Sequence, residues 1–236
     1  MSVALDHLVI ASATLEEGVA WCEATLGVTP GPGGKHPLMS THNRLLKIAT
    51  TAFPNAYLEI IAIDPSAPAP SRPRWFGLDA PELQSQLRSG PRLIHVVART
   101  TNLDMHRWGL ITLGLQPGEP VSASRETPTG VLVWQILVRR DGQLECEGAL
   151  PTLIQWSGQH PAQSMPDSGI TLESLRLKGL PERVQALLRM KGVQIESPSR
   201  AQPPPGGPEP PGPGESDSNP AVITVKLNTP RGTVTL

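Results

Sequence analysis

The sequence predicts an α+β fold of paired βαβββ modules, followed by a partial third βα-β-β module at the C-terminus. Three observations predict it: apolar runs of strand length, one amphipathic helix per unit, and matching segments that recur 87 or 88 positions apart. Glycine and proline turns separate the runs. We place the first module at residues 1–75, the second at 76–165 and the partial third at 166–236.

The first strand is predicted over residues 3–11, which are almost continuously apolar, as is typical of a strand buried on both faces. Regular alternation would put His7 on one face of this strand and Asp6 on the other. A polar pair inside an apolar strand marks this segment for attention.

A helix is expected next. Thr14 and Glu17 form a T-x-x-E capping box, apolar side chains recur at helical spacing up to Leu26, and Gly27 supplies a C-terminal stop. Cys22 falls on the inner face of this helix, so we expect it to pack rather than react.

The rest of the first module is a loop-rich segment and two strands. Residues 28–44 contain three glycines and three prolines, and residues 45–50 and 57–63 have strand character. Residues 64–74 are rich in Pro, Ser and Ala and are expected to connect the modules.

The second module repeats the first. The segment Leu5–Val9 (LDHLV) is matched by Leu93–Val97 (LIHVV), and TLGVTPG at 25–31 is matched by TLGLQPG at 112–118. Several matches in nearly the same register favour duplication of one strand-helix unit.

After its strand and helix, the second module is predicted to form a hairpin of residues 131–138 and 143–147, turning at Asp141-Gly142, and a last strand over 151–157.

The third module resembles the first two less closely than they resemble each other. It comprises a strand at 172–177, a helix at 180–191 and two strands at 221–227 and 232–236. Residues 197–220 are dominated by Pro and Gly, which predicts an extended or disordered loop.

Four polar residues lie in otherwise apolar strands: His7 and His95 in the two first strands, and Glu59 and Gln155 in the two last strands. Burying an unpaired histidine or carboxylate is costly, so each needs a partner, and a metal ion is one candidate. His7 also fits a core histidine bonded to a backbone carbonyl, and Glu59 also fits an edge position that faces solvent.

The glycine-rich segment carries three further candidates, His36, Asn43 and Arg44, because loops on a rigid scaffold often carry function. Arg44 is suited to hold a substrate carboxylate, or to begin a strand as a solvated side chain. Trp134 and Trp156 fit either the walls of a cleft or an aromatic core.

Charge and motifs narrow the function classes. The net charge is −1, which gives no basic face for nucleic acid and no polybasic segment for a membrane. No signal peptide or membrane span is evident, and the two cysteines match no disulfide or CxxC pattern. Dinucleotide, P-loop and GxSxG motifs are missing from the sequence. We expect a cytoplasmic protein that binds a small molecule.

The segments LDHLVI, GGKHPLMSTHN and YLEIIAI together resemble the vicinal oxygen chelate superfamily, and more specifically its glyoxalase-like domain branch, over about residues 3–160. The resemblance implies that two modules curl into half-barrels around a cleft, and that the cleft lies against His36 and Asn43. It also implies a divalent metal ion (zinc, nickel, iron or manganese) held by the first and last strands of each module, here His7, Glu59, His95 and Gln155. Gln155 departs from the pattern of glyoxalase I, which has a carboxylate there, and leaves His36 as the candidate base.

The resemblance therefore implies a metal-dependent lyase, isomerase or dioxygenase-type enzyme that chelates two neighbouring oxygens of a small molecule. The alternative is a metal-free protein of the same fold that binds a small molecule, as drug-sequestering members do. A third possibility is a scaffold whose Pro-rich loop binds a partner. The modules are expected to pair either within the chain or across a homodimer.

Overall fold

The computed structural model describes residues 3–127, 130–198 and 222–236, and its first part is a strand, a helix and three strands. The elements are β1 (Ala4–Ala11), α1 (Leu15–Leu26), β2 (Lys35–His36), β3 (Thr41–Lys47) and β4 (Tyr57–Ile63). The short β2 and the start of β3 lie in the segment 28–44 that was predicted as a loop. Helix α1 begins where the Thr14 side chain accepts a hydrogen bond from the backbone N–H of Glu17, and ends at Gly27 with a φ of 77°. Cys22 is fully buried on its inner face, as expected.

A short linker with two helical segments, η1 (Trp75–Gly77) and α2 (Pro81–Leu87), leads to the second module. That module consists of β5 (Arg92–Arg99), α3 (Leu103–Thr112), β6 (Glu119–Thr127), β7 (Gly130–Val138), η2 (Cys146–Gly148) and β8 (Thr152–Ser157). None of the described helices combines the length and the apolar character that a membrane span requires.

The predicted hairpin of residues 131–138 with 143–147 is wrong. Strand β7 pairs instead with β6, and residues 143–147 form an irregular segment that leads into η2. Strand β6 escapes notice in the sequence because it is polar and contains Pro120. Both features suit the edge of a sheet, where β6 lies.

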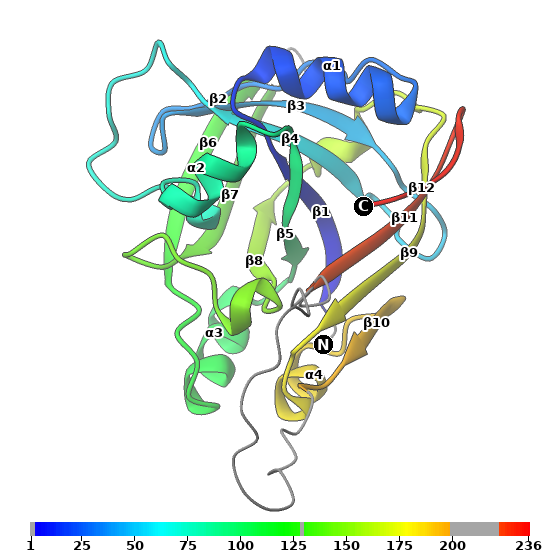
Figure 1. Cartoon of the computed structure of the whole chain (residues 1–236). Helices are drawn as coiled ribbons and strands as arrows, with labels where there is room; N and C mark the ends of the chain where they lie inside the picture. Colours follow the sequence, from blue (N-terminus) through cyan, green and yellow to red (C-terminus); the bar gives the residue numbers. More distant parts are fainter. Residues whose placement is uncertain (1–2, 128–129, 199–221) are drawn as a thin grey trace, which may run out of the picture.

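The two modules pair within one chain, as a single eight-stranded sheet in the order β2-β3-β4-β1-β5-β8-β7-β6. Strands β1 and β5 meet antiparallel at the centre, and each runs parallel to the last strand of its own module, β4 or β8. Figure 1 shows how the sheet curls so that both halves face a common concave side. The predicted α+β fold of paired βαβββ modules is confirmed.

A β-bulge in β1 changes the expected faces of this strand. The register against β5 shifts between Leu5 and His7, so Asp6 turns to the concave side beside His7, and Leu5 joins Leu8 in the core on the convex side. The expectation that Asp6 and His7 lie on opposite faces is therefore wrong. The bulge creates an acidic neighbour for the histidine.

The third part forms a second sheet, in the order β10-β9-β11-β12. Its elements are β9 (Thr171–Lys178), α4 (Glu182–Leu188), β10 (Val193–Glu196), β11 (Ile223–Thr229) and β12 (Gly232–Thr235), of which only β10 was not expected. Most of the predicted Pro/Gly-rich loop, from 199 onward, lies outside the described residues.

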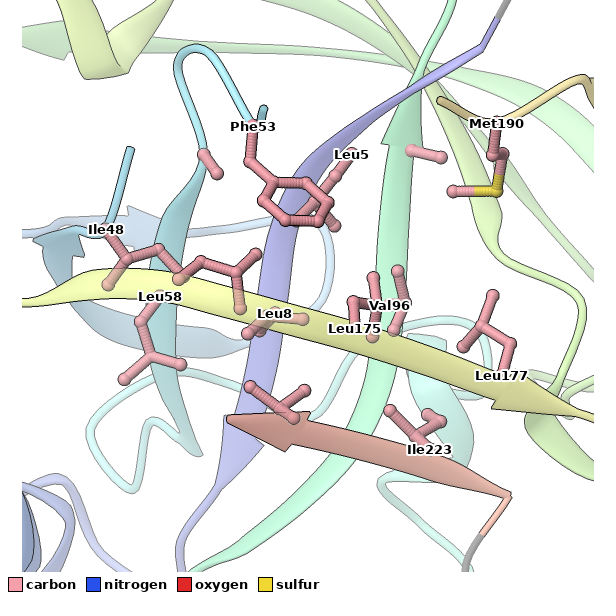
Figure 2. Packing of buried hydrophobic residues seen from close by; sticks show 14 of the residues in the cluster. Leu5, Leu8, Ile48, Phe53, Leu58, Val96, Leu175, Leu177, Met190 and Ile223 are labelled. Atoms are coloured by element: carbon pink, nitrogen blue, oxygen red, sulfur yellow. The ribbon is translucent and has the colours of Figure 1, made fainter. Parts of the chain in front are cut away.

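The second sheet covers the convex side of the large sheet. Figure 2 shows β9 and β11 crossing over β1 and β5, with Leu175 and Ile223 among the apolar side chains that meet Leu8, Leu58 and Val96. Helices α1 and α3 complete this core through residues such as Leu26 and Leu110. With its convex side sealed in this way, the large sheet leaves its concave side for a site.

Candidate functional site

The concave side contains a small cavity, with a volume of about 40 Å³, that both modules line. Five of the eight aromatic side chains in the sequence lie on it: Tyr57, Trp75, Phe76, Trp134 and Trp156. Polar side chains from β1, β2, β3, β4 and β6 interrupt these apolar walls: His7, His36, Asn43, Glu59 and Arg125. A mostly apolar cavity with a few converging polar groups is the usual form of a small-molecule site.

His7 lies between two carboxylates at the inner end of this cavity. Its Nδ1 is 2.7 Å from Asp6 Oδ1, and its Nε2 is 3.5 Å from Glu59 Oε2. Tyr57 stacks on the imidazole ring, with 4.6 Å between the ring centroids. The ring is therefore held in one orientation, with Nδ1 toward Asp6 and Nε2 toward Glu59.

The two carboxylates keep His7 protonated. Burial alone would lower its pKa, but the hydrogen bonds with Asp6 and Glu59 outweigh burial and raise the pKa of His7 to about 9. In turn, burial would raise the pKa of Glu59, yet the contacts from His7 and Asn43 lower it to about 2. At neutral pH the group is an imidazolium between two carboxylates.

Asp6 receives two further donors on its second oxygen. Both Trp156 Nε1 and His160 Nε2 lie 2.9 Å from Asp6 Oδ2. The backbone N–H of Ala162 donates to His160 Nδ1, so a neutral His160 carries its proton on Nε2 and donates it to Asp6. Burial alone would raise the pKa of Asp6, but these bonds and that of His7 hold it well below its usual range.

Asn43 connects the other polar groups of the cavity. Its Oδ1 accepts the backbone N–H of Gly34 at 2.8 Å, which fixes the orientation of the amide. Its Nδ2 then donates to Glu59 Oε1 at 2.6 Å and lies 3.4 Å from His36 Nε2. His36 Nε2 is accordingly the unprotonated nitrogen, and Nδ1 pairs with Thr41 Oγ1 at 3.0 Å.

His36 differs from His7 in charge. Burial lowers its pKa to about 4, because the opposing attraction of Glu59 is offset by the positive charges of Arg125 and His7. The cavity thus contains one protonated and one neutral histidine at neutral pH. Such divergent pKa values are the usual property of acid–base sites.

The arginine that lines the cavity is Arg125, and not Arg44 as the sequence suggested. Arg44 is exposed and alternates with Asn43 on the opposite face of β3. Arg125 comes from β6 and lines the cavity, with Nη1 3.4 Å from Asn43 Oδ1. Its position on a strand that the sequence did not reveal explains why it was missed.

The glycine-rich loop makes room for this arrangement. A Cβ on Gly33 would lie 2.0 Å from the backbone oxygen of Asn43, and a Cβ on Gly34 would lie 2.5 Å from Arg125 Cδ. The first contact cannot be relieved without moving a strand, whereas the second involves a flexible side chain. The two glycines thus allow Asn43 and Arg125 to approach the loop closely.

His95 and Gln155 do not join the group around His7. His95 Nε2 accepts the backbone N–H of Thr152 at 3.1 Å and contacts Thr152 Oγ1 at 2.9 Å. Burial, with the nearby charge of His7, lowers the pKa of His95 to about 3. Gln155 points to the convex side, where its Oε1 accepts the backbone N–H of Leu103 at the start of α3.

The strand register explains the position of Gln155. Val9 pairs with Glu59 in the first module, and Val97, which corresponds to Val9, pairs with Thr152 in the second. Thr152 therefore stands where the last strand would provide the second carboxylate.

The donor set does not fit a metal centre with ligands from both modules. Of the four expected ligands, His7, Glu59, His95 and Gln155, only His7 and Glu59 adjoin each other, and Nε2 of His95 is engaged by Thr152. Across residues 3–127, 130–198 and 222–236, no three His, Cys, Asp or Glu side chains are arranged to hold an ion. The expected ligand set of His7, Glu59, His95 and Gln155 is not assembled.

Comparison with solved structures places the fold among known ones. A hypothetical protein from Staphylococcus aureus superimposes with a TM-score of 0.55 at 15% identity, covering 75% of this chain and 70% of that chain. A methylmalonyl-CoA epimerase variant from Streptomyces coelicolor, in complex with 2-nitronate-propionyl-CoA, gives a TM-score of 0.42 at 18% identity, covering 66% of this chain and 96% of that one. At these identities the likeness concerns the fold alone. No curated protein matches the sequence significantly.

The family is identified by sequence. A family model described as a glyoxalase-like domain matches residues 5–191, which include both modules and much of the third part. Both the match and the paired modules agree with the resemblance found in the sequence. The chain belongs to the glyoxalase-like domain family, within the vicinal oxygen chelate superfamily.

Proposed function

We propose that this protein is an enzyme that moves a proton at the carbon next to a carbonyl group of a small oxygenated molecule, in an isomerase- or lyase-type reaction that uses side chains rather than a four-ligand metal centre. The observation that supports it is the placement of a protonated His7 and a neutral His36 in one cavity. Pairs of groups whose pKa values are driven apart are suited to acid and base roles.

His7 is the acid of this proposal. Its Nε2–H faces Glu59 Oε2 at 3.5 Å, a long contact that leaves it able to share a hydrogen bond with the carbonyl oxygen of a substrate in the cavity. As the neighbouring carbon loses its proton, negative charge develops on that oxygen, and the imidazolium stabilises it. Asp6 keeps the positive charge in place through the short bond to Nδ1.

His36 is the base. Its Nε2 carries a lone pair, and the only partner of that atom among the described residues is the long contact to Asn43. The proton would move from the substrate carbon to His36 Nε2 and return from there to the same carbon or to another atom. Glu59, with a pKa near 2, is a weaker base and serves to hold His7 and Asn43 in place.

Solvent-exchange measurements test this proposal. With 2-oxobutanoate in D₂O, the wild-type protein should exchange the C3 protons, as followed by proton NMR. Both His7→Gln and His36→Gln should slow this exchange by on the order of 10²-fold or more, the typical contribution of a general acid or base.

The matched control is His42→Gln, since His42 precedes Asn43 on β3 but faces away from the cavity. It should leave the exchange rate unchanged. Equal rates for His36→Gln and His42→Gln, or no exchange above the protein-free solution, would contradict an acid–base enzyme.

A metal-free small-molecule binder is the second candidate, favoured by the aromatic walls of the cavity. A binder needs no proton transfer. Ligands would therefore change the fluorescence of Trp134 and Trp156, while the protons of the ligands would not exchange with solvent. The same two measurements on one sample separate the two functions.

A further inference from the structure

An apolar groove opens beside the catalytic cavity. It has a volume of about 450 Å³, within the range of ~300–1,000 Å³ typical of ligand pockets. The glycine-rich loop, β3, β6, β7 and the segment 161–168 surround it, and its apolar walls include Leu45, Leu132 and Met165.

The groove and the cavity are adjacent, because Leu45, Arg125 and Pro161 line both. The inner cavity, at about 40 Å³, has room for only a few non-hydrogen atoms, about the space of two or three waters. The adjacent groove offers space for a larger part of a molecule that reaches His7 past these three residues.

Arg125 gives this junction a positive charge that forms no ion pair with the residues that the structure describes. No described carboxylate lies within ion-pair distance of its guanidinium, whereas Arg74, Arg107 and Arg139 all form ion pairs. Its Nη1 donates a hydrogen bond to Asn43 Oδ1, and the nitrogen of the same amide contacts Glu59 and His36. An anionic group on Arg125 would therefore lie one side chain away from the acid–base pair.

We propose that the substrate is a 2-oxo carboxylate with an unbranched apolar chain. The carbonyl oxygen points inward to His7, and the two other substituents of the trigonal carbon diverge toward the opening. One is the carboxylate, which binds Arg125 bidentately, and the other is the chain, which lies in the groove against Leu132 and Met165. This assignment rests on the proposed function and specifies the substrate class of the same site.

Affinity as a function of chain length tests the proposal. The probes are straight-chain 2-oxo carboxylates from 2-oxobutanoate to 2-oxodecanoate, kept below their micellar concentrations and measured by titration calorimetry on the full chain. Each added methylene group should lower the dissociation constant by about fourfold until the groove is filled.

Two adjacent residues provide the variant and its control. Leu132 lines the groove, whereas Val131, its neighbour on β7, is 61% exposed and lines neither the groove nor the cavity. Leu132→Ser should weaken the binding of 2-oxodecanoate by tenfold or more and leave that of 2-oxobutanoate unchanged, and Val131→Ser should change neither. Met165→Ser should act like Leu132→Ser, and Met165→Leu should restore the chain-length dependence.

The role of Arg125 is tested by comparing ligands with and without a carboxylate head group. Arg125→Gln should weaken all the acids by a similar factor, on the order of tenfold, since it removes a charge-assisted pair common to them all. Decanol should bind Arg125→Gln and the wild type equally.

Three results would overturn the proposal: no measurable binding of any acid, an affinity independent of chain length, or equal effects of Leu132→Ser and Val131→Ser. Its failure is distinguishable from that of the proposed function. Binding that strengthens with chain length but gives no deuterium exchange would reject the enzyme and keep the groove. Deuterium exchange at a rate that does not depend on chain length would reject chain binding in the groove and support the acid–base enzyme.

Discussion

His160 donates its Nε2–H to Asp6 Oδ2 at 2.9 Å, joining the loop after β8 to the bulge at the start of β1. Because Asp6 in turn bonds to His7 Nδ1, His160 reaches the cavity through one carboxylate. It is a positioning residue: its bond is to Asp6 rather than to His7, and it does not line the cavity. Together the three side chains connect the two modules at the site.

The donors to Asp6 can be removed singly. His160→Ala and Trp156→Phe should each lower the free energy of unfolding by about 1–3 kcal/mol, the cost of leaving a buried polar group without a partner. Both donate to the same oxygen, so the double variant should lose an amount that differs from the sum of the single losses. Urea unfolding of the four proteins measures this coupling. Strict additivity would show that Asp6 is not shared between them.

Stability should be greatest near pH 6.5. Between pH 6.5 and about 9 the folded protein binds the additional proton, on His7, so the free energy of unfolding falls as the pH rises. Below pH 6.5 the unfolded chain binds more protons than the folded protein, because folding lowers the pKa values of His36 and His95. At still lower pH the lowered pKa of Glu59 has the same effect. Stability therefore also falls as the pH drops.

Variants separate these two limbs of the pH dependence. In chemical unfolding at a series of pH values, His7→Gln should flatten the decline above pH 6.5, and His36→Gln should reduce the decline below it. A His7→Gln protein that keeps the full alkaline decline would show that another group is responsible.

The two glycines of the loop should respond differently to alanine. Gly33→Ala forces a Cβ against the backbone of Asn43 and should destabilise the protein by about 2 kcal/mol or more. Gly34→Ala displaces only the Arg125 side chain, so stability should change by less than about 0.5 kcal/mol while the binding of carboxylates weakens. Thermal unfolding and titration calorimetry check the pair. Equal destabilisation by both changes would contradict this account of the loop.

The sequence predicted the features that depend on periodicity. Helix α1, the central strands and the duplication follow from apolar spacing and turn residues, and His7 and Glu59 stand out because they interrupt apolar strands. Both lie in the cavity, and so do His36 and Asn43. Their roles in catalysis and binding stay predictions.

Features that depend on register or on distant contacts escaped the sequence. A bulge leaves no signal in composition, so the side chain of Asp6 was assigned to the wrong face. Gln155 was matched to Glu59 by position along the last strand, but pairing with β5 puts Thr152 there. Arg125 and His160 come from an edge strand and a loop, and only tertiary packing brings them to β1 and β3.

The division into modules at 1–75, 76–165 and 166–236, the homodimer and the cytoplasmic location likewise stay predictions. The central β1–β5 pair shows that no second chain is needed to join the modules.

The most direct test of the central claim is proton exchange of 2-oxobutanoate by protein stripped of metal with a chelator, with the metal content determined by elemental analysis of the same sample. The account predicts that the stripped protein exchanges at the rate of the untreated protein, and that a His7→Ala, Glu59→Ala double variant exchanges at the rate of the protein-free solution whether or not metal is added. Loss of exchange on stripping, with recovery on addition of about one equivalent of zinc, nickel, manganese or ferrous iron, would contradict it and restore the metal-dependent mechanism.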